Sequence, residues 1–173
     1  MIKSLNFLFL SILNYLPHII ILFLVFTGTD FSFVFSGMNF SFNIVYLVIF
    51  YWVLKKPDVI GFGFIFLAGI INDVVLNLPI GLSAFIYLLM CGIASFIRTI
   101  TLVPNIFYDW VFFFIGLLII SSIYYIILTL IFNSDILYGI LMLQAFLTAL
   151  VYPLIAKLFD GLFKVILGKE NAE

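Results

Sequence analysis

Long apolar stretches, separated by short polar or Pro- and Gly-containing breaks, dominate the chain. An α-helix needs about 20 mostly apolar residues to cross the hydrocarbon core of a bilayer, and somewhat fewer at the short end of the range. Six stretches approach this length, so we predict an all-α membrane protein of about six transmembrane helices in a single domain, 1–173. The predicted bounds are 5–26, 40–54, 59–76, 82–97, 105–132 and 136–156, followed by an interfacial C-terminal tail at 157–173.

The breaks between the stretches differ in character. Pro79 and Gly81 mark a turn between the third and fourth predicted helices, because proline and glycine are the strongest local interruptions of regular structure. The stretch 27–39 is polar at first and then carries a Phe-Ser-Phe pattern near a Gly-Met pair, which we interpret as a connection. The second and fourth helices are the shortest, so local thinning of the bilayer would have to accommodate them.

The basic residues lie on one side of this predicted arrangement. The loops after the first, third and fifth helices contain no Lys or Arg. With six crossings, the other loops and both termini lie on the opposite face, and Lys/Arg enrichment in short loops marks the cytoplasmic side. We therefore predict a multi-pass protein with both termini in the cytoplasm. The seven basic residues are Lys3, Lys55, Lys56, Arg98, Lys157, Lys164 and Lys169.

Composition excludes several classes of function. The chain is 66% hydrophobic and 9% charged, which is too apolar for a soluble domain of 173 residues. Its one cysteine, Cys91, cannot form an internal disulfide and has no metal-ligand spacing around it. The sequence contains no phosphate-binding loop, no zinc helix motif and no paired intramembrane carboxylates. We therefore expect no catalytic residues, no cofactor, no metal and no nucleic-acid partner.

A few polar residues lie inside apolar stretches and need a physical reason. Asp73, beside Asn72, has no basic residue at its depth. It is either a fixed polar or ligand contact, or a carboxylate that reaches the outer interface or bonds the backbone of the Pro79–Gly81 turn. Gly61, Gly69 and Asp73 fall near one face of the third helix, which either receives a partner helix or packs internally.

The start of the fifth helix has a different pattern. Asn105 is an N-cap candidate, and Asp109 in the first turn suits the positive end of the helix dipole. Trp52 and Trp110 fall at predicted cytoplasmic helix ends, where an aromatic belt is expected. His18 follows Pro17 inside the first helix and is either a satisfied core residue or part of a proton relay.

One segment, 51–84, resembles a known family. Its core reads Gly-Ile-Ile-Asn-Asp, then five residues, then Pro-x-Gly, followed by an apolar helix. Together with the chain length, the helix count and the layout of charge, this segment is similar to the rod-shape-determining protein MreD. The residues that carry the resemblance are Tyr51, Trp52, Pro57, Gly61, Gly69, Asp73, Pro79, Gly81 and Ala84.

The resemblance implies a non-enzymatic inner-membrane subunit of the bacterial cell-elongation machinery. Such a subunit binds the single-spanning protein MreC and helps maintain rod shape and lateral peptidoglycan synthesis with RodA, the elongation transpeptidase and MreB. It also implies a fold similar to the substrate-binding subunit of energy-coupling-factor transporters. The alternative is therefore a small-molecule-binding membrane subunit of a transporter, although the first helix lacks the alanine-x-x-x-alanine contact motif typical of those subunits.

Overall fold

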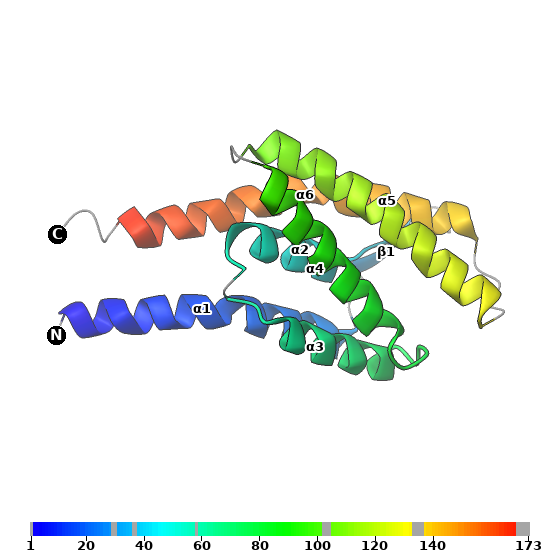
Figure 1. Cartoon of the computed structure of the whole chain (residues 1–173), viewed down its shortest axis with the longest axis horizontal. Helices are drawn as coiled ribbons and strands as arrows, with labels where there is room; N and C mark the ends of the chain where they lie inside the picture. The colour runs from blue at the N-terminus through cyan, green and yellow to red at the C-terminus, as the bar shows by residue number, and fades with distance from the viewer. Residues whose placement is uncertain are drawn as a thin grey trace.

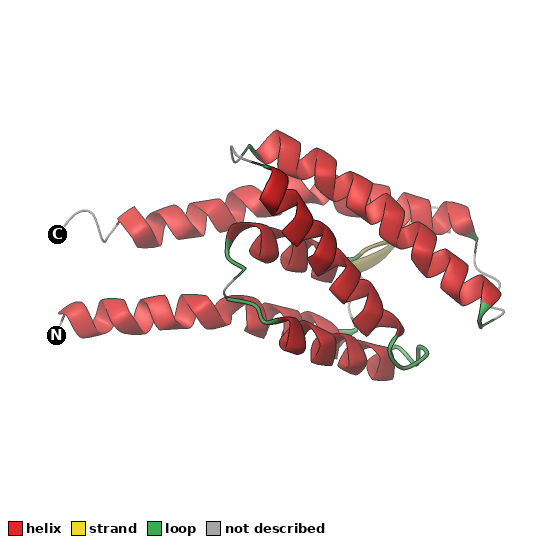
Figure 2. Cartoon of the chain, viewed as in Figure 1, coloured by secondary structure: helices red, strands yellow, loops and turns green. Residues whose placement is uncertain are grey.

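The computed structural model describes the backbone of residues 2–28, 31–35, 38–57, 59–101, 105–132 and 137–168. Side chains are described for residues 15–28, 42–57, 59–101, 105–132 and 137–161. These residues form six α-helices and one β-hairpin (Figures 1 and 2). The helices are α1 (Ile2–Thr27), α2 (Ile44–Lys55), α3 (Phe62–Val75), α4 (Leu82–Ile100), α5 (Ile106–Leu130) and α6 (Tyr138–Gly168); the strands are β1 (Phe31–Phe35) and β2 (Met38–Phe42).

The six helices agree with the predicted all-α class, but the segment between α1 and α2 was wrongly predicted to be a connection followed by a helix start at residue 40. There the chain forms an antiparallel hairpin, in which Phe31 pairs with Phe42 and Phe35 with Met38. The sequence alternates aromatic and polar residues in this segment, and a period of two is the pattern of a strand. Since β2 ends at Phe42, the second helix begins at Ile44 instead of residue 40.

Three helices of the described part are long and apolar enough to cross a membrane: Leu82–Ile100, Ile106–Leu130 and Tyr138–Gly161. The expectation that every predicted stretch would be long enough was wrong for two helices. α2 has 12 residues and α3 has 14, so at about 1.5 Å per residue they are only about 18 Å and 21 Å long. The third prediction was too long because residues 59–61 precede the helix and Leu76 is already its C-cap.

α2 forms the centre of the molecule (Figure 1). Val45 and residues 47–54 are all buried, so side chains on every side of this helix are covered by neighbouring elements. It packs against α1, α4 and α6. A short helix that is apolar all round is stable only where other helices surround it, because it has no polar face to turn toward water.

The outer helices leave many large apolar side chains exposed. Ile19, Leu67, Ile126 and Leu154, on four different helices, are each 51–64% exposed. So many exposed large apolar side chains are unusual for a monomeric soluble protein and are normal where a protein faces lipid. The exposed side chains and the three long apolar helices agree with the predicted membrane protein.

Both termini lie at the same end of the molecule, at the left in Figure 1, and the long helices α1 and α6 extend beyond the body there. The α2–α3 and α4–α5 connections lie toward this end, whereas the α3–α4 connection lies at the opposite end. The predicted tail is not separate from the sixth helix, because α6 continues unbroken through Gly168.

Candidate functional site

The connection between α3 and α4 is organised by Asp73. This residue is fully buried, and its two carboxylate oxygens accept hydrogen bonds from the backbone N–H groups of Gly81, at 2.7 Å, and Ser83, at 2.8 Å. Gly81 is the N-cap residue of α4, so the carboxylate supplies acceptors to N–H groups that have no partner within their own helix. The predicted contact between Asp73 and the turn is present, and the partial positive charge of the helix N-terminus replaces a basic partner.

The same turn has two backbone features that fix its path. Gly81 has φ of +98°, a conformation that residues with a Cβ rarely adopt. Asn77 has φ of +52° and follows the C-cap of α3. The N–H of Leu78 donates to the carbonyl oxygen of Asp73, and that of Asn77 to Val74, which is the bonding pattern of a Schellman motif. The left-handed conformation of Asn77 was not predicted. Asparagine tolerates this conformation better than most residues, so its place at the end of the third apolar stretch was the available signal.

Gly69 lies against α4. A Cβ on Gly69 would overlap the backbone of Ala84, so the two helices touch at this point. Asn72 adds a hydrogen bond of 2.9 Å from its Nδ2 atom to the Ser83 hydroxyl. The predicted face of Gly61, Gly69 and Asp73 is therefore not an open surface for a partner, because its second and third members are buried against α4. Internal packing, the other interpretation of this face, is what the structure shows.

The remaining motif residues lie away from that turn. Trp52 is 1% exposed and contacts the Phe159 ring, so its assignment to an aromatic belt was wrong. The Trp110 ring is partly exposed and donates from Nε1 to the Ala149 carbonyl oxygen at 2.7 Å. Pro57 lies in the α2–α3 connection, and Gly61 is the exposed N-cap of α3.

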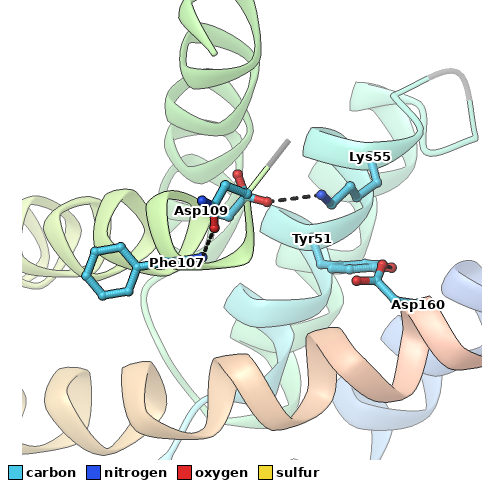
Figure 3. Close-up of polar contacts among 6 residues, drawn as sticks. Tyr51, Lys55, Phe107, Asp109 and Asp160 are labelled. Atoms are coloured by element: carbon cyan, nitrogen blue, oxygen red, sulfur yellow. Dashed lines mark hydrogen bonds and ion pairs between the residues drawn. The ribbon is translucent and has the colours of Figure 1, made fainter. Parts of the chain in front are cut away.

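A second polar cluster joins α2, α5 and α6 near the end of the body that faces the termini (Figure 3). The Lys55 Nζ atom lies 3.0 Å from the Asp109 Oδ2 atom, and the Asp109 side chain is only 3% exposed. The Tyr51 hydroxyl, one turn away on α2, donates to Asp160 Oδ1 at 2.6 Å. At the start of α5 the Asn105 side chain accepts from the Phe107 N–H at 2.9 Å, as predicted. Asp109 lies in the first turn of α5, as predicted. Its ion pair with Lys55 and the bond between Tyr51 and Asp160 were not predicted.

A polar cavity of about 260 Å³ lies at the opposite end of the body. It is bounded by the beginnings of α2, α4 and α6, the end of α3 and the second half of α5. Among the residues that the structure describes, its polar lining has three amides and five hydroxyls. The amides are Asn43, Asn72 and Gln144; the hydroxyls are Tyr46, Ser83, Ser121, Tyr124 and Thr148.

An apolar groove of about 410 Å³ lies on the outside, between α4 and α5. Every described residue that lines it is apolar or glycine. A Cβ on Gly92 would meet no atom within 4 Å, and one on Gly116 would lie 3.2 Å from the side chain of Ile93. The floor of the groove is therefore open at Gly92 and closely packed at Gly116.

In the described part of the chain, no group of three or more His, Cys, Asp or Glu side chains lies close enough to hold a metal ion. Cys91 is buried and forms no disulfide. No protein-family model, curated protein or solved structure matches the chain.

Proposed function

We propose that this chain is a non-enzymatic subunit of the bacterial cell-elongation machinery in the inner membrane, of the MreD kind. In this proposal it binds a single-spanning MreC-like protein and supports rod shape and lateral peptidoglycan synthesis together with RodA, the elongation transpeptidase and MreB. The resemblance of residues 51–84 motivates the proposal. The apolar groove between α4 and α5 is the structural observation that supports the proposal.

The groove has the properties that a transmembrane helix requires of a binding surface. Helices in lipid associate through close packing, because burial of apolar surface gives little advantage when lipid tails are equally apolar. Small residues permit that packing, and Gly92 offers a backbone with open space above it. The walls are formed by α4 and α5, two of the helices long enough to cross a membrane. The groove includes residues 89–100 of α4, which is about 17 Å of helix, so a partner helix would be supported over about half of a hydrocarbon core of about 30 Å.

The partner proposal can be tested with two matched glycine substitutions. Gly92→Leu would fill the groove, whereas Gly63→Leu places the same side chain on α3, where a Cβ also meets no atom within 4 Å. The purified variants are incubated in lipid nanodiscs with the MreC-like protein of the same genome. We expect the wild type and Gly63→Leu to recover it equally and Gly92→Leu to recover less than about a tenth as much.

Two outcomes would contradict this proposal in different ways. Full recovery of the MreC-like protein by Gly92→Leu would show that the groove is not the binding surface. No recovery by the wild type, in nanodiscs as well as in mild detergent, would remove the partner itself. The folded state of each variant is checked by its thermal unfolding midpoint, so that loss of binding is not confused with loss of structure.

The proposal includes six crossings with both termini in the cytoplasm. Two observations support it. The Lys and Arg residues lie near the start of α1, in the last part of α6 and beyond it, and at or beside the α2–α3 and α4–α5 connections. These helix ends and connections lie toward one end of the molecule (Figure 1). The short helices α2 and α3 would then be enclosed by longer neighbours or by a locally thinner bilayer. Reporter fusions should read cytoplasmic after positions 56, 98 and 169 and periplasmic after positions 30, 77 and 133. A periplasmic C-terminus would refute the six crossings.

A second candidate is a small-molecule-binding subunit of a transporter. The polar cavity favours it, whereas the absence of alanine from the first helix, 2–27, disfavours it. The two candidates predict different co-purified proteins: a single-spanning MreC-like protein for the first, and an energising transporter subunit with its ATPases for the second. Identification of the proteins retained in mild detergent therefore discriminates between them.

A further inference from the structure

The polar cavity contains an unsatisfied acceptor. The Asn43 Oδ1 atom is buried and accepts no hydrogen bond from the residues that the structure describes. Asn43 is the N-cap residue of α2, yet its side chain makes no capping bond. Its backbone N–H donates to the Thr148 hydroxyl at 3.0 Å, which fixes the residue at the cavity wall. A buried acceptor without a donor is destabilising by itself. The Oδ1 atom has almost no accessible surface, so the Asn43 side chain must rotate toward the cavity to accept a hydrogen bond from a ligand and relieve that penalty.

The rest of the lining presents both donors and acceptors. Asn72 uses its Nδ2 atom for one bond, to Ser83, and a primary amide has a second N–H and a carbonyl oxygen besides. None of the hydrogen bonds formed by described residues uses the Gln144 amide, which also faces the cavity. Among the described lining residues none is charged. The cavity therefore selects for an uncharged molecule that can both donate and accept hydrogen bonds.

The apolar side chains of the lining restrict the class of ligand further. Leu76, Leu117, Ile120 and Leu141 contribute to the same wall surface as the amides. A polyol would place hydroxyl groups against these side chains without partners, which is unfavourable. A flat ring with polar edges satisfies both kinds of wall, because its face is apolar while its edge pairs with amide side chains, as nucleobases do with Asn and Gln. The volume of about 260 Å³ is below that of pockets for drug-sized ligands, which begin near 300 Å³.

We propose that this cavity binds a small, uncharged nitrogen heterocycle of the nucleobase type, with an N–H group of the ligand donating to Asn43 Oδ1. The site is separate from the proposed partner surface, because none of the described residues lines both the cavity and the α4–α5 groove. Binding here therefore neither requires nor excludes a partner helix, and the failure of one proposal would leave the other standing.

The test uses the full-length protein in lipid nanodiscs and defined probes. Uracil and adenine represent the proposed class. Orotate is uracil with an added carboxylate and tests the exclusion of charge, toluene is a flat ring without polar atoms, and glucose is a polyol. Isothermal titration calorimetry measures the dissociation constant of each. We expect measurable binding of uracil or adenine and at least tenfold weaker binding of the other three.

Two substitutions locate the binding in the cavity. Asn43→Val removes the buried acceptor and leaves the α2 cap unchanged, because the Asn43 side chain makes no capping bond. It should weaken ligand binding about tenfold or more, as expected for the loss of one hydrogen bond to a buried group. Ala145→Phe places a ring in the cavity that Ala145 lines and should abolish binding. Leu143→Phe, at an exposed position on the same helix, is the control and should leave binding unchanged.

The outcomes are distinguishable even if one variant fails to fold. If Ala145→Phe is unstable, Asn43→Val alone decides whether the buried acceptor contacts the probe. Equal binding of uracil or adenine by the wild type and Asn43→Val would overturn the proposed contact. Preferred binding of toluene or glucose would overturn the ligand class. No binding of uracil or adenine by the wild type would overturn the proposal as a whole.

Discussion

The ion pair between Lys55 and Asp109 provides a quantitative test of the structure. The two charged atoms lie 3.0 Å apart, but the side chains differ in burial: Lys55 is 25% exposed and Asp109 is 3% exposed. Removing the lysine would strand a buried carboxylate, whereas removing the carboxylate would leave an ammonium group that can reach polar surroundings. We therefore predict that Lys55→Met destabilises the protein more than Asp109→Asn does.

The magnitudes follow from the geometry. Removal of one partner from a buried ion pair lowers the free energy of unfolding by about 3–5 kcal/mol. Asp109 lies in the first turn of α5, where the helix dipole continues to stabilise a carboxylate by about 0.3–1 kcal/mol. We expect Lys55→Met to lower the free energy of unfolding by about 2–4 kcal/mol. Asp109→Asn keeps a polar group of the same size, so we expect it to lower the free energy of unfolding by only about 1–2 kcal/mol.

The double variant makes the test sharper. Replacing a buried ion pair by apolar residues of similar volume is often neutral or stabilising, because the desolvation of both charges is removed with their attraction. Lys55→Met combined with Asp109→Leu should therefore lie within about 1 kcal/mol of the wild type. In a double-mutant cycle the two sites should then show a coupling energy of about 2 kcal/mol or more.

The assay is reversible unfolding in mixed micelles, followed by tryptophan fluorescence. Lys157→Met removes an exposed lysine of α6 and is the control, with an expected change below about 0.5 kcal/mol. The reasoning is refuted if Asp109→Asn is more destabilising than Lys55→Met. It is also refuted if the double variant with Asp109→Leu is as unstable as the sum of its single variants, since that result would mean that the two side chains do not interact.

Three further predictions concern the helix contacts. Gly69→Leu should lower the free energy of unfolding by more than about 3 kcal/mol, because a side chain there overlaps the backbone of Ala84; Gly63→Leu, which meets open space, should leave the unfolding midpoint unchanged. Asp73→Asn should lower the free energy of unfolding by about 1–2 kcal/mol, because one acceptor oxygen and the negative charge at the α4 N-terminus are lost. Amide hydrogen exchange at the start of α4 should accelerate, and unchanged exchange would contradict the capping role. Tyr51→Phe should lower the free energy of unfolding by about 1.5–3 kcal/mol, because it removes the 2.6 Å hydrogen bond to a carboxylate of α6. A change below about 0.5 kcal/mol would show that this bond does not stabilise α6.

The sequence by itself was sufficient for the number and order of the helices and for the turn between α3 and α4. Apolar stretches determine where helices form in a membrane protein, because every backbone polar group in lipid must be satisfied within its own segment. The pairing of Asp73 with the turn was also predictable. Gly81 and the aspartate are close along the chain, and a carboxylate without a basic partner must find backbone donors.

Local pattern was a weaker guide where an element is short. Mean apolar character cannot distinguish a strand from a helix, and the hairpin Phe31–Phe35 and Met38–Phe42 was assigned to a connection and a helix start. Alternation of aromatic and polar residues carried the correct signal, but over only five residues on each strand. The length of α2 was overestimated because residues 40–42 belong to β2. The length of α3 was overestimated because the adjoining residues Val59, Ile60 and Leu76 are as apolar as the helix itself.

Only the tertiary structure decided which residues from distant segments meet. Lys55 and Asp109 are 54 residues apart and Tyr51 and Asp160 are 109 apart, so no local spacing relates them. The polar cavity likewise draws its lining from five helices, and each contributes only a few residues that appear ordinary within their own helix. Hydropathy records whether a residue prefers lipid or water, whereas the partner of a polar side chain depends on how the helices pack, which is a property of the whole chain.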